Sequence, residues 1–275
     1  MIEIKNLSFS YGSNTVLQNI SLKLEEGRIY GLLGENGVGK TTLLTLLCGL
    51  KKTEQGSITI DGFNPYKRQP ELLHSLYYLP DEVMPYNQTA RRFARFGGSF
   101  WPLFDMDKFL GIMREFETDA DMKMNKMSSG QLKKTYIAFA LACNPRYLFM
   151  DEPTNGLDIP SKAQFRKAVG LYTSEDSTIV ISTHQVRDLE NIIDPIIILD
   201  RCDVLLNATI EDISSRLFFD YGTTLHQGAL YSEQLPGGFI QVLMNSEGRE
   251  SKVNIEALFN AVHRHKDLIK GMFNR

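Results

Sequence analysis

The stretch GENGVGKT at residues 34–41 constrains the fold of this chain more than any other. It fits the pattern G-x-x-x-x-G-K-[ST], whose glycines let the backbone wrap around an anion without a Cβ in the way. The apolar run GRIYGLL at 27–33 precedes it, and KTTLLTLLCGL at 40–50 follows with the pattern of a helix that ends at Gly49. A buried strand, a glycine-rich turn and a helix are the context that a phosphate-binding loop requires. These residues therefore predict an α/β fold with a phosphate site after a central strand.

Each residue type in this loop has a role in phosphate chemistry. Lys40 supplies positive charge to the β- and γ-phosphates of a nucleotide, and the hydroxyl of Thr41 ligates Mg²⁺. Tyr11, in SFSYG, is predicted to stack on adenine, although a tyrosine at a strand end more often only packs. The residues predicted to bind the nucleotide in this part of the chain are Tyr11, Gly34, Glu35, Asn36, Gly37, Val38, Gly39, Lys40, Thr41 and Thr42.

Two further apolar strand patterns end in side chains suited to phosphoryl transfer. YLFMDE at 147–152 ends in Asp151 and Glu152, and TIVISTH at 178–184 ends in His184. Ligands of open α/β sheets bind outside the carboxyl ends of the strands, so these side chains are expected beside the loop. Asp151 is predicted to hold Mg²⁺, Glu152 to deprotonate the attacking water, and His184 to hydrogen-bond the γ-phosphate. Taken alone, the aspartate could be a helix cap and the histidine a structural residue.

The order of patterns along the chain predicts one large domain over 1–214 and a small α+β appendage over 215–275. Alternating apolar and polar residues near the N-terminus indicate half-exposed strands. Helical spacing then dominates from about 86 to 144 and predicts an inserted helical subdomain. After it, apolar strand patterns alternate with helical ones, one of which covers 186–193, and this alternation favours a parallel sheet with helical crossovers.

A second serine- and glycine-rich turn, KMSSGQLKK at 126–134, stands directly before a helical pattern. Ser128 and Gln131 have the spacing of a capping box, so the stretch is explained in part as a well-capped helix. A capping box needs no glycine at position 130, whereas an anion that approaches a helix end does. The turn therefore raises the question of a second phosphate contact.

Taken together, GENGVGKTT, MSSGQ, YLFMDEPTNGLD and STH resemble the nucleotide-binding subunit of an ATP-binding-cassette (ABC) transporter. Their order and spacing match that family over about residues 1–210. The resemblance implies a P-loop NTPase fold of the ABC type, with a mostly parallel central sheet, an N-terminal antiparallel β-subdomain and the inserted helical subdomain. It also implies a head-to-tail dimer that sandwiches two ATP molecules. In such a dimer the signature turn of one subunit binds the γ-phosphate held by the other, and these residues would be Ser128, Ser129, Gly130 and Gln131, with Asp158 of NGLD in the loop that crosses the interface.

The sequence departs from the family pattern in two places. Met127 and Ser129 replace a leucine and a glycine of the usual signature, and the serine adds a Cβ where the phosphate approaches. Asp81, in YLPDE, stands where the family usually has glutamine. A carboxylate ligates magnesium or accepts a hydrogen bond from water but donates none. Asp81 is therefore predicted as a third catalytic residue, with Glu82 as a candidate to share the role.

The resemblance to single-cassette bacterial exporter-type subunits implies an ATPase that uses ATP and Mg²⁺. Its partners would be a separate integral-membrane permease and a second nucleotide-binding subunit, a copy of this chain or a paralogue. The longest apolar runs fall well short of the roughly 20 residues that span a bilayer. With three scattered cysteines indicating a reducing compartment, this predicts a cytoplasmic protein, peripheral at the inner face of the membrane.

Two alternatives remain open from the sequence. A soluble ABC-type ATPase acting on nucleic acid or ribosomes is disfavoured by the net charge of −3 and by the single cassette. A GTPase is disfavoured because no N-K-x-D motif is present. The stretch RRFARFGGSFWPLF at 91–104 fits three interpretations: subdomain core with solvated arginines, a socket for a helix of the membrane subunit, or a platform for single-stranded nucleic acid.

Overall fold

The computed structural model describes residues 1–273, and within them six strands form the central sheet in the order β5-β6-β7-β3-β8-β9. Strands β5, β6, β7, β3 and β8 run parallel, and β9 closes the edge antiparallel to β8. Their side chains are almost all buried, as expected for strands covered on both faces. The strands are β3 (Ile29–Leu33), β5 (Leu76–Leu79), β6 (Tyr147–Asp151), β7 (Thr178–Thr183), β8 (Ile196–Asp200) and β9 (Asp203–Ala208).

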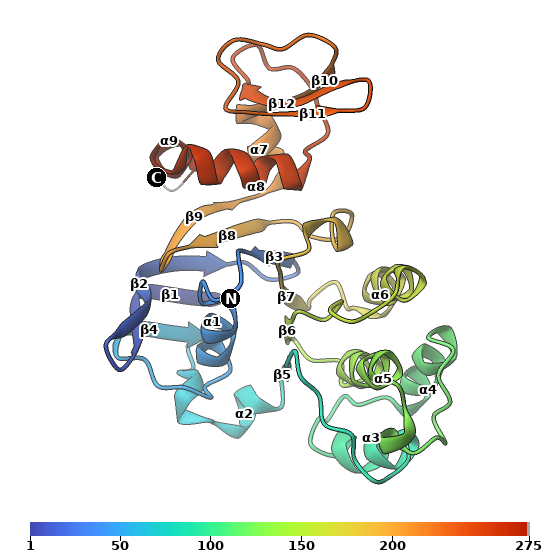
Figure 1. Ribbon diagram of the computed structural model, residues 1–275. Coiled ribbons are helices and arrows are strands. Elements are labelled where there is room, and N and C mark those ends of the chain that lie inside the picture. Colours follow the sequence, from blue (N-terminus) through green and yellow to red (C-terminus); the bar gives the residue numbers. More distant parts are fainter. Residues whose placement is uncertain (274–275) are drawn as a thin grey trace.

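A smaller antiparallel sheet forms the N-terminal β-subdomain, in the order β2-β1-β4. The alternating sequence places one face inward, where Ile4, Leu17 and Ile58 pack against the helix α1. In Figure 1 this sheet lies at the left of the molecule, with α1 between it and the central sheet. The elements are β1 (Ile2–Tyr11), β2 (Asn14–Leu24), β4 (Gln55–Ile60), α1 (Lys40–Leu47), and the short η1 (Pro65–Lys67) and α2 (Pro70–Leu73).

The helical subdomain lies on the other side of the central sheet from the β-subdomain (Figure 1). Thr89, Asp105 and Ser128 each accept a hydrogen bond from a backbone N–H of the first turn that follows, so three caps begin its helices. The large buried rings of Phe109 and Phe139 fill its core. The helices are α3 (Ala90–Gly98), α4 (Met106–Glu115), η2 (Met124–Lys126) and α5 (Ser129–Ala142), and the crossover helix α6 (Ile159–Tyr172) packs beside α5.

The helix predicted over 186–193 is wrong, because the structure holds only the 3₁₀ turn η3 (Val186–Asp188) there. Leu189 and Ile193 are buried, which accounts for the helical spacing of apolar residues. The backbone of this segment forms turns with i→i−3 hydrogen bonds instead, such as Ile192 N–H to Leu189 O at 2.9 Å. Pro195 follows after Asp194, and a proline disfavours helical backbone at the residue before it, so a helix here would have to end before Asp194.

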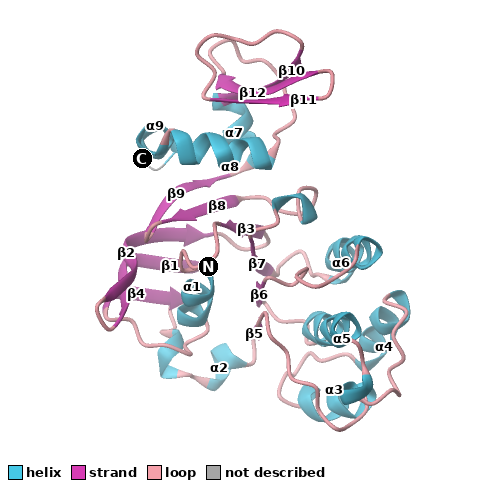
Figure 2. Ribbon diagram, viewed as in Figure 1, coloured by secondary structure: helices cyan, strands magenta, loops and turns pink. Residues whose placement is uncertain are grey.

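The C-terminal appendage is an α+β unit with an antiparallel sheet in the order β10-β12-β11 (Figure 2). It rests on the β9 edge of the central sheet, where Lys266 and Lys270 bond to the carboxylates of Asp200 and Asp203. Its apolar residues belong to the same continuous cluster as those of the central sheet. The elements are α7 (Ile210–Arg216), β10 (Leu217–Gly222), β11 (Tyr231–Leu235), β12 (Gly238–Met244), α8 (Ile255–Arg264) and α9 (Lys266–Phe273).

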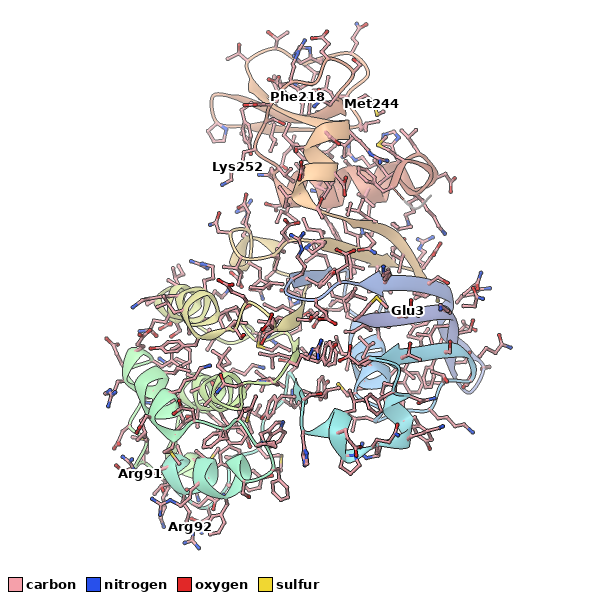
Figure 3. The ribbon with its side chains drawn as sticks, turned by 180° about the vertical axis from the view of Figure 1, so that it is seen from behind. Glu3, Arg91, Arg92, Phe218, Met244 and Lys252 are labelled. Carbon is pink, nitrogen blue, oxygen red and sulfur yellow. The ribbon has the colours of Figure 1, made fainter. Side chains whose placement is uncertain are left out.

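Figure 3, seen from behind, places Phe218, Met244 and Lys252 in this appendage at the end of the molecule away from Arg91 and Arg92. No helix between residues 1 and 273 combines the length and the apolar character needed to cross a bilayer.

Candidate nucleotide-binding site

The predicted phosphate loop connects β3 to α1, as the sequence indicated. Gly37 and Gly39 have φ angles of 83° and 109°, which favour glycine. A Cβ at Gly39 would lie 3.0 Å from side-chain atoms of both Val16 and Leu17, so β2 packs closely on the turn. Among the described residues, no side chain caps the N-terminus of α1. The backbone N–H groups at this helix end are therefore available to an anion.

Lys40 occupies the centre of this loop. Its side chain is only 6% exposed, and Nζ donates to the carbonyl oxygens of Gly34 at 2.8 Å and Glu35 at 3.1 Å. The same Nζ lies 3.4 Å from Oε1 of Glu152. The loop therefore holds a buried ammonium where the phosphate-binding pattern predicts one.

Thr41, in the first turn of α1, and Asp151, the last residue of β6, lie in contact at the edge of the central sheet, as the sequence predicted. Thr41 Oγ1 donates to Asp151 Oδ2 at 2.6 Å, and Ser182 Oγ, from β7, donates to Oδ1 at 2.5 Å. Tyr78 also donates to Oδ2 at 3.5 Å, and burial, followed by the charge of Asp151, raises the pKa of its hydroxyl. A hydroxyl and a carboxylate in contact form a fitting oxygen-ligand set for Mg²⁺.

Glu152 and His184 lie next to this pair. Glu152 has a left-handed φ of 44°, and such strain in a residue other than glycine is common at functional sites. Its Oε2 accepts from the His184 backbone N–H at 3.3 Å, and the ring Nδ1 of His184 lies 3.0 Å from Oε1. Oε1 is buried and makes no hydrogen bond to any described residue. A buried carboxylate oxygen of this kind is an acceptor available to a water molecule.

Tyr11 lies at the end of β1, beside the helix that follows the loop. Its hydroxyl is 3.4 Å from Thr42 Oγ1, and Lys51 Nζ lies 4.8 Å from its ring centroid. The residue is 47% exposed. Its role in stacking on adenine stays a prediction.

The serine- and glycine-rich turn begins α5 with the predicted capping box. Ser128 N–H donates to Gln131 Oε1 at 3.0 Å, and Gln131 N–H donates to Ser128 Oγ at 3.2 Å. Ser128 and Ser129 are exposed, and no hydrogen bond or ion pair within residues 1–273 joins 128–131 to the phosphate loop. A Cβ at Gly130 would meet nothing closer than 3.9 Å, so intramolecular packing does not require this glycine.

Asp158 has a local structural role in addition to its predicted position at an interface. Its Oδ1 accepts the backbone N–H of Ser161 at 2.9 Å and caps α6. Hydrogen bonds from the Ser161 side chain and then its backbone lower the pKa of Asp158.

The structure does not bring Asp81 into contact with the Thr41–Asp151 pair. Lys133 Nζ, from α5, donates to the Asp81 carbonyl oxygen at 2.5 Å and to Oδ1 at 3.2 Å. Asn155 Nδ2 lies 3.3 Å from both carboxylate oxygens. The predicted third catalytic role of Asp81 stays a prediction. Lys133 and Asn155 were missed because only the tertiary fold joins them to it.

The aromatic and basic stretch at 91–104 divides between core and surface. Phe93 and Trp101 pack against Phe139, whereas Phe96 and Phe100 are 61% and 71% exposed. Arg91 pairs with Asp121 at 2.7 Å. The core interpretation therefore explains part of the stretch and leaves an exposed aromatic surface.

A family model described as ABC transporter matches residues 17–155. The ABC transporter ATP-binding protein YtrB of Bacillus subtilis (strain 168) is 27% identical over 264 residues, which cover 92% of this chain and 89% of that protein. The ABC transporter ATP-binding protein NatA of the same organism is 31% identical over 208 residues, covering 72% of this chain and 83% of NatA.

A solved structure of an ATP-binding subunit of an ABC transporter superposes with a TM-score of 0.71 at 25% identity, covering 78% of this chain and 91% of that one. The family match includes the phosphate loop, the signature turn and Glu152, the residues whose geometry is described above. The protein therefore belongs to the ABC transporter family, as one of its ATP-binding, ATP-hydrolysing subunits.

Proposed function

We propose that this chain hydrolyses ATP with Mg²⁺ in composite sites shared by two subunits and thereby drives a separate membrane permease. Lys40 and the N-terminus of α1 hold the phosphates, and Thr41 with Asp151 holds the metal. Bound there, Mg²⁺ would supply positive charge that stabilises the phosphates during transfer. Glu152 orients and deprotonates the attacking water, and His184 contacts the γ-phosphate.

The observation that carries this proposal is the unbonded Oε1 of Glu152. It is buried, with Lys40 Nζ at 3.4 Å and His184 Nδ1 at 3.0 Å, and it makes no hydrogen bond to any residue that the structure describes. Such a carboxylate is held in place by charge while it keeps an acceptor position for water.

The dimer part of the proposal follows from the signature turn. Ser128 and Ser129 are exposed, and Gly130 leaves open space above the N-terminus of α5. No hydrogen bond or ion pair among the described residues joins the turn to its own phosphate loop, so we expect a γ-phosphate to reach the turn from a second subunit. Asp158 caps α6 and follows Gly156 by two residues. Gly156 lies near the signature turn, because a Cβ at Gly130 would be 3.9 Å from Gly156 O.

Replacing Glu152 by Gln tests the proposed hydrolysis and dimer together. The variant should bind ATP, lose hydrolysis by about 10²-fold or more, and elute as a dimer on gel filtration with ATP and Mg²⁺. Glu175, an exposed acid before β7, gives the matched control Glu175→Gln, which should behave as the wild type. A Glu152→Gln variant that stays monomeric at saturating ATP would contradict the sandwich.

The permease and the location at the membrane rest on the exposed aromatic surface of the helical subdomain. Phe96 and Phe100 offer apolar area to a partner helix. A tagged protein purified from detergent-solubilised membranes should bring an integral-membrane chain with it, and Phe96→Ser with Phe100→Ser should release that chain. Recovery of ribosomal RNA or DNA instead would favour the alternative function.

We also propose that the chain divides into a nucleotide-binding domain over 1–214 and an appendage over 215–275. The reason is that strand β10 starts a separate sheet at Leu217, directly after α7.

A further inference from the structure

Asp81 is held by two donors that come from different elements. Lys133 is a residue of α5, the helix that begins with the signature turn, and Asn155 follows β6 and Glu152. Lys133 bonds to both the carbonyl and the carboxylate of Asp81, and Asn155 reaches both carboxylate oxygens. Both oxygens of this carboxylate therefore have a donor within the protein.

Lys133 is an unusual lysine because it is buried. It is 4% exposed, whereas lysine ammonium groups almost never lie inside a protein without a partner. Burial lowers the pKa of Lys133, and Asp81, followed by Asp151 and Glu152, acts in the opposite direction. The ammonium therefore lies in the field of the acids at the nucleotide site as well as beside Asp81.

We propose that Lys133 and Asn155 are positioning residues for ATP hydrolysis, and that Asp81 acts as the counterion that anchors Lys133 rather than as a ligand of Mg²⁺. The inference rests on the proposed function, because it assigns a task to residues beside the proposed catalytic edge. The ion pair joins the loop after β5 to the helix that carries the signature turn. It also offsets the negative charge of Asp81, whose side chain is 40% exposed.

The pairing explains how an aspartate is accommodated at this position. An isolated carboxylate would repel ATP, and an isolated buried ammonium would be costly, but each removes the penalty of the other. The pair therefore ties the helical subdomain to the catalytic edge in the absence of nucleotide. Movement of α5 relative to the central sheet must carry the loop after β5 with it.

A double-mutant cycle on ATP hydrolysis tests the pair. Asp81→Asn keeps the size of the side chain without its charge, and Lys133→Met keeps the stem without the ammonium. Each single variant should lower kcat by about 10-fold with KM for ATP nearly unchanged, and the double variant should lose about as much as either single variant, since each single variant already breaks the tie between the loop and α5. If the double variant loses the product of the two single losses, the proposal is overturned.

The Mg²⁺ dependence separates the counterion from a metal ligand. Half-maximal activity of Asp81→Asn should occur at the wild-type Mg²⁺ concentration. A rise of about 10-fold or more, retained in the double variant, would identify Asp81 as a ligand of the metal and overturn the proposal. Asn155→Ala should resemble Asp81→Asn in kcat, because it loosens the same carboxylate, and full activity of Asn155→Ala would remove that residue from the proposal.

Urea unfolding without nucleotide distinguishes failure of this inference from failure of the proposed function. Each single variant should lower the unfolding midpoint, and the double variant should lower it by less than the sum. The exposed pair Glu3–Lys5, at 2.9 Å in β1, provides the matched control and should show no coupling. If the wild type hydrolyses ATP but neither cycle shows coupling, this inference fails alone. If the wild type hydrolyses no ATP, the proposed function fails, and the unfolding cycle still decides whether the pair exists.

Discussion

Oε1 of Glu152 lies 3.4 Å from Nζ of Lys40, so the acid after β6 and the lysine after β3 form an ion pair across the sheet edge. Both side chains are nearly buried, and each therefore depends on the other for charge compensation. A bound nucleotide would add its own negative charge beside the lysine. The geometry indicates that Lys40 serves the resting site as well as the occupied one.

Replacement of Lys40 by Ala should remove nucleotide binding. The variant loses the charge-assisted hydrogen bonds that Lys40 is proposed to make to phosphate, and it should bind ATP about 100-fold more weakly or worse. Titration with a fluorescent ATP analogue measures the affinity. Lys52→Ala, an exposed lysine after the same helix, is the control and should bind as the wild type does. Unchanged affinity of Lys40→Ala would remove the phosphate-loop assignment.

Replacement of His184 by Ala should reduce the rate of hydrolysis more than the affinity for ATP. The ring contacts Glu152 and is predicted to contact the γ-phosphate, so kcat should fall by about 10²-fold while the Kd for ATP changes by less than about 3-fold. Steady-state ATPase assays and equilibrium binding separate the two quantities. His74→Ala, an exposed histidine before β5, should leave both unchanged. A large loss of affinity with unchanged kcat would contradict the role.

The contact between Thr41 and Asp151 predicts a specific change in the magnesium requirement. Thr41→Ala removes one of the two oxygens that meet at 2.6 Å and should raise the Mg²⁺ concentration for half-maximal activity about 10-fold or more. Thr41→Ser keeps the hydroxyl and should behave nearly as the wild type does. ATPase activity measured over a Mg²⁺ titration compares the three proteins. Equal requirements in the alanine and serine variants would show that the hydroxyl is not a ligand.

Asp158 predicts an acid-dependent part of the stability. Hydrogen bonds from Ser161 lower its pKa in the folded state below the unfolded value of 3.8, so the charged form stabilises the fold. This contribution is complete above pH 3.8 and is lost as the pH falls through the lower folded pKa. Asp158→Asn retains a cap without a charge, so its melting temperature should approach that of the wild type as the solution is acidified. Calorimetry between pH 2 and 6 measures the difference, and a constant difference would contradict this role.

The meeting of the proposed catalytic residues at one edge of the sheet was predictable because it follows from topology. The phosphate loop, Asp151, Glu152 and His184 each follow an apolar strand pattern, and parallel strands deliver their carboxyl ends to one edge. No knowledge of side-chain packing was needed for that step.

The surroundings of Asp81 were not predictable in the same way. Leu132 and Tyr136 of α5 are buried, as apolar residues of a packed helix should be, but α5 is buried on nearly every side. Lys133 is therefore buried as well, and only the packing of α5 against the loop after β5 reveals its partner. The prediction of a helix over 186–193 was wrong for a related reason. Leu189 and Ile193 are buried and have helical spacing, but the backbone there is not an α-helix.

The bond between Lys133 and Asp81 also limits how this protein can change over generations. If each charge is tolerated only in the presence of the other, a lineage that replaced either one first would pass through an impaired intermediate. The two positions should then be inherited as a unit, and homologous subunits with glutamine after β5 should be free of any need for a cation at the position of Lys133.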